Sequence, residues 1–370
     1  MGYNIAVFPG DGVGPELINE GIKIIDKAAE LDKFEVKWAK YPHGAEHYTK
    51  AGEALTEKAL KEIKNSCNAI YCGTFDISNE QKIPKLIRDY FGQFISLRPV
   101  KLLPNVESPI ANKTNDEIDF TVIRECTEDF YAGASGRAKN GKNRHKIDID
   151  KGACKIRMTM DVESKGNEIA YQIGFLSRKG CERVIKYGFE YAKRKNINKI
   201  TSIDKANVIE AYSFWRENFE KVAKEYQGID YEFNLIDAAV VNLIKQPEKY
   251  KVIIAPNMFG DILSDLGAAL QGFGFACRGS INPEGISMFE PVHSSAPKLK
   301  EQGIVNPIAT IWAGALLLDS IGQHKSGELI MKAVESVLKE GRTMTHDLSG
   351  NNSTAEMGDA ILDRLIEMHE

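Results

Sequence analysis

Cysteine is scarce in this sequence and is not spaced for metal or disulfide chemistry. The 370 residues contain six cysteines, and no two form a CxxC pair or a zinc-type spacing. A small domain held together by disulfides or zinc is therefore excluded. We interpret the six as reduced thiols, mostly buried, which predicts a cytoplasmic protein.

Long hydrophobic runs and an excess of one charge are also absent. No apolar run in the sequence approaches the roughly 20 residues of a membrane-spanning helix. The 48 basic and 52 acidic residues are well mixed, and the net charge is −4. This balance favours neither nucleic acid nor an anionic membrane as a partner. The N-terminus enters a strand-like segment directly, so no signal or transit leader is expected.

The composition and length that remain are those of a globular protein with two domains. Hydrophobic residues make up 43% and charged residues 27%. A single core stops growing before 370 residues, so two domains are expected. Short apolar runs, such as residues 4–8, 69–72 and 252–255, alternate with helical patterns. This alternation predicts an α/β fold.

The stretch 250–272 carries the most specific chemical pattern. A short buried strand at 252–255 is followed by a helical pattern from Gly260, which places Asp261 and Asp265 one turn apart. The two carboxylates repel each other unless a cation lies between them. In open α/β sheets the ligand crevice lies where such strands end, so a Mg²⁺ site is indicated. The alternative is a solvated acidic face with Asp261 near a helix N-cap.

The glycine-rich turn at residues 9–15, PGDGVGP, is a second candidate. Its glycines give GxGxG and not the GxGxxG of a dinucleotide fingerprint, and Pro15 follows at a helix start. We interpret it as a loop that approaches a ligand or another loop closely.

Three arginines lie at predicted strand or helix ends in an otherwise balanced chain. Arg88, Arg98 and Arg124 could be separate surface ion pairs, or together a clamp for a carboxylate or phosphate. Lys205, directly after a strand, is a candidate base or a surface lysine. Asp237 is a candidate third metal ligand or a helix cap, and His293 lies in a loop where it could contact a ligand.

Seven motifs in order give a resemblance that spans nearly the whole chain. They are GDGVGPE at 10–16, LRPVK at 97–101, IRECTEDFYAG at 123–133, DKANV at 204–208, FGDILSDL at 259–266, FEPVH at 289–293 and NPIAT at 306–310. Together they resemble the isocitrate and 3-isopropylmalate dehydrogenase family of β-decarboxylating dehydrogenases. The resemblance implies an open, non-Rossmann α/β sheet in two domains. The large, cofactor-binding domain would comprise residues 1–93 and 272–370. The dimerisation domain would comprise residues 94–271, with a protruding arm at 133–170.

The resemblance also implies roles in a homodimer with shared active sites. Asp261 and Asp265 match metal ligands for Mg²⁺ or Mn²⁺, and Asp237 matches the ligand from the neighbouring subunit. Lys205, also from the neighbour, matches the base, and Tyr131 matches the acid. The substrate contacts are implied at Arg88, Arg98, Arg124 and Asn207. The cofactor contacts are implied at His293, Ser294, Ser295, Ala296, Lys298 and Asn306.

Several departures from the family pattern bear on cofactor and substrate. Lys298 stands where NAD-using members carry Asp, but residues 346–350, HDLSG, look like the NAD group, so NAD is expected over NADP. Lys82, Pro84 and Lys85 keep neither the isocitrate nor the isopropylmalate signature. We expect an isopropylmalate-type enzyme of leucine biosynthesis. The alternatives are a tartrate or D-malate dehydrogenase, then an isocitrate or homoisocitrate dehydrogenase.

Two other functional classes compete with the oxidoreductase. A Mg²⁺-dependent phosphoryl-transfer enzyme would also use an acidic pair, arginines and a glycine-rich turn. The sequence has no GxxxxGK[ST] loop and no kinase signature, which argues against it. A non-catalytic regulatory subunit could keep the fold, but the presence of Tyr131, Lys205 and all three aspartates favours activity.

Overall fold

The computed structural model divides the chain into two compact units and describes residues 2–76, 83–111, 113–150 and 153–369. The first unit is Met1–Gln93, Leu97–Ile118 and Gly267–Glu370, and the second is Phe94–Ser96 and Asp119–Leu266. The sequence-based boundaries place residues 97–118 in the second domain, whereas here they pack with the first unit. Lys82, one of the residues considered for substrate choice, lies outside the described residues.

The first unit is built on strands in the order β4-β13-β14-β3-β1-β2. Strands β14, β3, β1 and β2 run parallel, and β13 is antiparallel to β14. Strand β3 is buried at all four positions, as expected of a short apolar run between neighbours. The strand bounds are β1 Gly2–Phe8, β2 Glu35–Lys40, β3 Ala69–Cys72, β4 Ile95–Lys101, β13 Cys277–Ile281 and β14 Ser287–Pro291.

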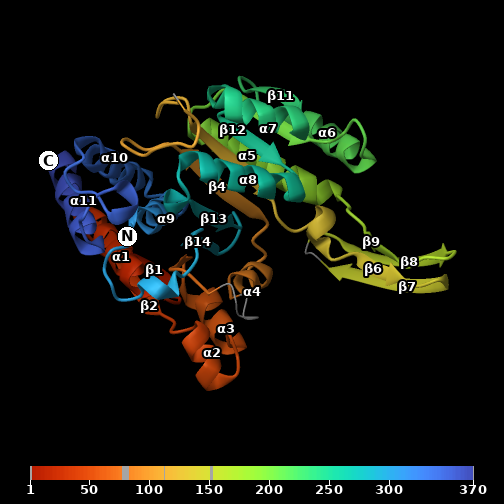
Figure 1. The fold of residues 1–370 in the computed structure, drawn as a ribbon, viewed down its shortest axis with the longest axis horizontal. Coiled ribbons are helices and arrows are strands. Elements are labelled where there is room, and N and C mark those ends of the chain that lie inside the picture. The colour runs from red at the N-terminus through yellow and green to blue at the C-terminus, as the bar shows by residue number, and fades with distance from the viewer. Residues whose placement is uncertain (1, 77–82, 112, 151–152, 370) are drawn as a thin grey trace. The chain divides into compact units, whose positions relative to one another are not determined.

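Helices α1, α9, α10 and α11 of the first unit pack together (Figure 1). Helix α9 is buried on nearly every side, because almost all its residues are apolar. The helix bounds are α1 Gly14–Leu31, α2 Ala45–Ala51, α3 Glu57–Ser66, α4 Ile83–Tyr90, α9 Ile308–Ser320, α10 His324–Glu340 and α11 Thr354–His369. Single 3₁₀ turns lie at Phe273–Phe275, Pro297–Leu299 and His346–Leu348.

The second unit is built on four parallel strands in the order β5-β12-β10-β11. Their carboxyl ends all point to one edge, which is where Arg124, Lys205 and Asn257 lie in the sequence. The bounds are β5 Asp119–Glu125, β10 Lys199–Asp204, β11 Asp230–Leu235, β12 Val252–Ala255, α5 Arg178–Arg194, α6 Glu210–Ala223, α7 Ile236–Lys245 and α8 Asn257–Gln271, with 3₁₀ turns at Asp129–Ala132 and Pro247–Lys249.

The segment expected to form an arm is a pair of two-stranded antiparallel sheets in the second unit. Strand β6 (Ser135–Ala138) pairs with β9 (Ile169–Gln172), and β7 (Gly141–Asp150) pairs with β8 (Lys155–Ser164). Side chains along β8 alternate between exposed and half-buried, because successive residues of a strand face opposite sides. The mixed α/β fold expected from the sequence is confirmed.

None of the helices that the structure describes combines the length and the apolar character needed to cross a membrane.

Candidate active site

Arg124 is the centre of a polar cluster at the carboxyl end of β5. Its Nε and Nη2 donate to Asn257 Oδ1 at 2.9 and 2.7 Å, and its Nη1 forms an ion pair with Asp261. The side chain of Arg124 is 13% exposed and that of Asp261 is 34% exposed. The guanidinium is thus fixed in orientation while the carboxylate stays accessible to solvent.

Strand β12 and helix α8 bring Asn257 and Asp261 to this arginine. Asn257 is the first residue of α8, directly after the turn at Pro256, and its Nδ2 donates to the Glu128 carbonyl at 3.0 Å. Gly260 lets the helix approach, because a Cβ there would lie 2.6 Å from Cβ and Cγ of Arg124. Helix α8 begins at Asn257, three residues before Gly260, which places Asp261 inside its second turn and not at an N-cap.

Tyr131 completes the cluster from the 3₁₀ turn Asp129–Ala132. The guanidinium carbon of Arg124 lies 5.6 Å from the centre of its ring, and the side chain is half-exposed. Partial burial, together with the charge of Asp261 and a hydrogen bond with it, raises the pKa of Tyr131 above its ordinary value. The phenol is accordingly held in its protonated form next to a carboxylate and a guanidinium.

Asp129 connects the 3₁₀ turn to the start of α8 from a buried position. Its backbone has φ of 63°, in the left-handed region, and its side chain accepts from Met258 N at 2.9 Å and from Tyr212 Oη at 3.0 Å. These bonds offset the burial of the carboxylate and fix the turn that carries Tyr131. Sequence reasoning did not single out Asp129 or Asn257. The position of Asn257 directly after a buried strand, the rule that selected Lys205, could have found it.

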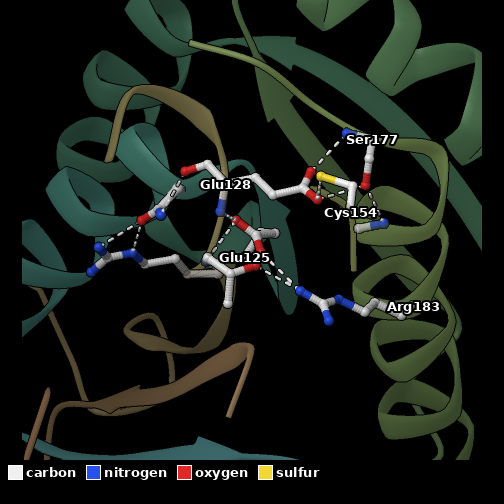
Figure 2. A network of polar contacts seen from close by, with 9 residues as sticks. Glu125, Glu128, Cys154, Ser177 and Arg183 are labelled. Atoms are coloured by element: carbon white, nitrogen blue, oxygen red, sulfur yellow. Dashed lines mark hydrogen bonds and ion pairs between the residues drawn. The ribbon is translucent and has the colours of Figure 1, made fainter. Parts of the chain in front are cut away.

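A second layer of charged groups supports the segment between Arg124 and Tyr131 (Figure 2). Buried Glu125 accepts from the backbone N–H groups of Thr127 and Glu128 and lies 3.6 Å from Arg183 Nη2. Glu128 accepts from the Ser177 backbone N–H at 2.7 Å, from its hydroxyl at 2.5 Å, and from the Cys154 thiol at 3.6 Å. The two glutamates thus tie the loop to α5 and to the segment before β8.

Asp261 and Asp265 lie one turn apart on α8, as their spacing predicts. Asp265 is exposed and Asp261 is half-buried. Among the residues described, no three His, Cys, Asp or Glu side chains lie close enough together to hold a metal ion.

Lys205 and Asp237 form a second charged pair in the same unit. Lys205 follows β10, Asp237 lies in the first turn of α7, and the two side chains are ion-paired. The hydrogen bond from Lys205 lowers the pKa of Asp237. Asn207 lies exposed in the turn that follows Lys205. The structure thus brings Lys205 and Asp237 together, with the Lys205 side chain 23% and the Asp237 side chain 65% exposed.

The other two arginines belong to the first unit. Arg88 lies half-buried in the last turn of α4, and Arg98 lies in β4 with 5% of its surface exposed. Lys85 on the same helix forms an ion pair with Asp89.

The expected cofactor residues also lie in the first unit, around the loop after β14. Burial lowers the pKa of His293, whose Nδ1 lies 3.2 Å from the Ser294 carbonyl oxygen. Asn306 is buried; its Oδ1 accepts from Ile308 N at the start of α9, and its Nδ2 donates to Asp347 Oδ2 at 3.0 Å. Ser295 is buried, whereas Ser294 and Lys298 are exposed and Ala296 is half-buried. Asp347, in the stretch HDLSG at 346–350, is not among the predicted site residues. Its carboxylate nevertheless lies next to Asn306, one of the expected cofactor residues.

The glycine-rich turn packs against two other loops of the first unit. Gly10 and Gly12 have φ of 78° and 57°, and a Cβ on either would overlap the backbone of Thr74 or Ser295. Backbone bonds join Asp11 N to Thr74 O at 2.6 Å and Val13 N to Ser295 O at 2.9 Å. The sequence predicts that this turn approaches a ligand or another loop closely, and the structure shows it against the two loops that contain Thr74 and Ser295.

Comparison with known proteins places this geometry in a family. Residues 4–361 match the family model of isocitrate/isopropylmalate dehydrogenase. The chain is 35% identical to the D-malate dehydrogenase [decarboxylating] of Escherichia coli strain K12, over 96% of this chain and 97% of that one. It is 34% identical to the 3-isopropylmalate dehydrogenase of Thermobifida fusca strain YX, over 98% of both chains.

A solved structure of a related protein has the same fold. The isocitrate dehydrogenase of Methylococcus capsulatus superposes with a TM-score of 0.79 at 30% identity, covering 98% of this chain and 99% of that one. Members of the family generally use a divalent metal ion and NAD(P). The expectation drawn from the seven motifs is confirmed: the chain belongs to the isocitrate/isopropylmalate dehydrogenase family and is an oxidoreductase of the decarboxylating dehydrogenase type.

Proposed function

We propose that the chain oxidises and decarboxylates a 2-hydroxy diacid of the (2R)-malate type, with hydride transfer to NAD(P), and that the substrate is 3-isopropylmalate. The observation that carries the proposal is the contact of Arg124, Asp261 and Tyr131 at the end of one parallel strand. This cluster provides a cation for a carboxylate, an oxygen ligand for a metal and a phenol that can give up a proton.

The aspartates fit a hard divalent cation, Mg²⁺ or Mn²⁺, because both prefer carboxylate oxygens. In the proposal, Asp261 and Asp265 come from one subunit and Asp237 from the other. Asp261 and Asp265 lie one turn apart on α8, whereas Asp237 lies on α7. Such an ion, when bound, acts as a Lewis acid that makes the substrate hydroxyl more acidic and stabilises negative charge on that oxygen.

The chain's own residues then bind the substrate and move two protons. Arg88, Arg98 and Arg124 hold the carboxylate that is lost, and the Asn257 oxygen keeps Arg124 in a fixed orientation. Lys205 Nζ, positioned beside Asp237, accepts the hydroxyl proton in its neutral amine form, after its ammonium has released a proton to solvent. Tyr131 Oη donates a proton to C3 after CO₂ leaves.

The cofactor is proposed to lie with its adenosine half at His293, Ser294, Ser295, Ala296, Lys298 and Asn306, and with its nicotinamide or the substrate near Asn207. NAD is proposed over NADP, because the Asp347 carboxylate beside Asn306 opposes the charge of a 2′-phosphate. Lys298, which could attract that phosphate, is exposed.

The substrate's side group is proposed to be apolar. A substrate with a further carboxylate would need a basic side chain on α4; Lys85 is a candidate, but its ammonium is already ion-paired with Asp89. D-malate or tartrate is the next candidate, supported by the 35% identity to a D-malate dehydrogenase. Isocitrate and homoisocitrate follow, and a regulatory subunit is the alternative from another class.

The assembly is proposed to be a homodimer with shared sites. Helices α7 and α8 each carry exposed apolar side chains: Val241, Ile244 and Ile262 are 48%, 43% and 52% exposed. Such residues on two helices of one unit fit a surface that a second copy covers. The six free thiols agree with a reducing, cytoplasmic location.

A spectrophotometric panel tests the proposed substrate and cofactor. NAD⁺ and NADP⁺ would each be combined with 3-isopropylmalate, D-malate, D- and L-tartrate, isocitrate and homoisocitrate, with Mg²⁺ or Mn²⁺. We expect one strong combination, 3-isopropylmalate with NAD⁺, that EDTA abolishes. A preference for another diacid would replace the substrate, and no turnover from a folded dimer would support the regulatory subunit.

A further inference from the structure

Glu128 is a buried carboxylate in the second unit to which the proposed reaction gives no role. The residue is 0% exposed. Its side chain points towards Ser177 and Cys154 (Figure 2), and it accepts from the Ser177 backbone N–H at 2.7 Å and from the Ser177 hydroxyl at 2.5 Å. A carboxylate is costly to bury unless hydrogen bonds compensate it, so these bonds determine where the side chain lies.

The start of helix α5 holds the carboxylate end of this residue. Ser177 is the N-cap of α5, because its Oγ accepts from Gly180 N at 3.0 Å. A Cβ on Gly180 would lie 2.4 Å from the carboxylate carbon and both carboxylate oxygens of Glu128, so the glycine provides the space for this group. The N-terminus of a helix also favours a negative charge. The carboxylate is thus anchored against the first turn of α5.

The main-chain carbonyl of the same residue holds the amide of Asn257. Asn257 is 1% exposed, and its Nδ2 donates to the Glu128 carbonyl oxygen at 3.0 Å. Because a carbonyl oxygen can only accept, it selects the NH₂ end of the amide and directs Oδ1 to the other side. There Oδ1 accepts from Arg124 Nε and Nη2 at 2.9 and 2.7 Å. Glu128 therefore connects α5 to the guanidinium through a single amide.

The orientation of the Asn257 amide decides which N–H groups of Arg124 remain for a ligand. A guanidinium has five N–H donors. Two of them bind Asn257 Oδ1, and one on Nη1 binds Asp261. By this count of contacts with the described residues, one N–H on each terminal nitrogen is left for a substrate carboxylate. An amide turned the other way would present its own N–H groups to the guanidinium, and the arginine would lose this orientation.

We propose that Glu128 is a positioning residue for Arg124. Its carboxylate, anchored at the start of α5, fixes its own carbonyl group, which orients the Asn257 amide and through it the guanidinium. The inference rests on the proposed role of Arg124 in binding the substrate carboxylate, and it extends that role to a buried residue that acts through Asn257.

A double-mutant cycle with Arg124 tests the inference. Kinetics would be measured with NAD⁺ and 3-isopropylmalate, or the diacid that replaces it in the panel. Glu128→Ala should lower kcat/KM about tenfold or more, because small displacements of binding groups cost this much. The loss should appear as a higher KM for the diacid, with the KM for NAD⁺ unchanged. In an Arg124→Lys background the same change should cost less than about threefold, because lysine cannot make the paired bonds to Asn257.

Three further variants separate positioning from folding. Glu128→Gln should recover part of the loss, because its amide oxygen can still accept from Ser177. Gly180→Ala displaces the carboxylate without removing it, and it should raise the KM for the diacid even though alanine favours the helix. It carries the test if Glu128→Ala does not fold. Val184→Ala, fully buried on the same helix, should lower the melting temperature and keep the wild-type KM for the diacid.

The outcomes distinguish the inference from the proposed function. A wild-type KM for the diacid in Glu128→Ala and Gly180→Ala, together with a loss in Arg124→Lys, would overturn the inference alone. Equal losses from Glu128→Ala in both backgrounds would show that Glu128 maintains the fold and does not act through Arg124. Wild-type kinetics of Arg124→Lys, or a wild type that turns over none of the diacids, would contradict the proposed function, and the inference would fall with it.

Discussion

Tyr131 is the residue on which the proton chemistry of the proposed reaction depends most directly. Its phenol lies half-exposed next to Arg124, and burial and the Asp261 carboxylate raise its pKa. A protonated phenol can donate to a carbon that becomes negatively charged, and a phenyl ring in the same place cannot.

Replacing Tyr131 with Phe should therefore lower kcat on the preferred substrate by about 100-fold or more, which is the usual contribution of a general acid. The melting temperature should change little, because the side chain is 49% exposed. Steady-state kinetics and differential scanning calorimetry measure the two effects, with Tyr48→Phe on α2 as an exposed control. A kcat within a few fold of the wild type would remove Tyr131 from the mechanism.

Glu125 makes the stability of the second unit depend on pH. Complete burial raises its pKa from an ordinary 4.5 to about 7, against the opposing hydrogen bonds of Thr127 and Glu128. Because the folded pKa lies above the unfolded one, the folded state holds the proton more tightly. The associated stability is complete below about pH 4.5 and is lost as the pH rises to about 7.

We expect Glu125 to lower the free energy of unfolding by about 3 kcal/mol between those two pH values. Urea unfolding of the wild type and Glu125→Gln at several pH values gives the free energy of unfolding of each protein as a function of pH. The difference between the two is the contribution of the Glu125 carboxylate. Glu125→Gln should flatten the decline, and exposed Glu284→Gln should not. Parallel curves for the wild type and Glu125→Gln would show that the carboxylate does not titrate in this range.

At the scale of elements, the approach of α8 to β5 decides the geometry of the site. A Cβ on Gly260 would lie 2.6 Å from the first two side-chain carbons of Arg124, which are too close to the backbone to move freely. Gly260→Ala should cost about 1–3 kcal/mol of stability, as overpacking usually does, and should lower kcat/KM more than tenfold by displacing Arg124.

The exposed position Ala269 on the same helix gives the matched control. Ala269→Gly should lose about 1 kcal/mol or less through helix propensity and should keep full kcat/KM. Kinetics and thermal unfolding of both variants distinguish a displaced arginine from a weakened helix. Full activity of Gly260→Ala would mean that α8 can retreat without affecting the site.

Local sequence patterns predicted the strands at 69–72 and 252–255, because short apolar runs bounded by Gly or Pro are typical of buried strands and too short for helices. The same holds for Asp261 and Asp265, whose relation lies within one helix turn. The position of Asn257 after a buried strand is also visible in the sequence, but its partner is not, because Arg124 lies more than 100 positions earlier in the chain. Asp129, Asp347 and the short helix α2 were not predicted, because contacts distant in sequence hold them in place.

At the scale of the whole molecule, the proposed homodimer divides each active site between two chains. The second unit contains two groups of interacting side chains. One is the cluster of Arg124, Tyr131 and Asp261, and the other is the pair of Lys205 and Asp237. In the proposal each site combines the first group of one subunit with the second group of the other. Activity should therefore require association of two chains.

A mixed dimer tests this account most directly. Lys205→Met and Asp261→Asn would each be made as homodimers, and a heterodimer of the two would be purified through different affinity tags. Each homodimer should lose about 100-fold or more of kcat. The heterodimer should recover up to half of the wild-type activity, because one of its two sites pairs an intact Asp261 with an intact Lys205. A pure heterodimer no more active than either parent would contradict the shared site and the residue roles on which the proposed function rests.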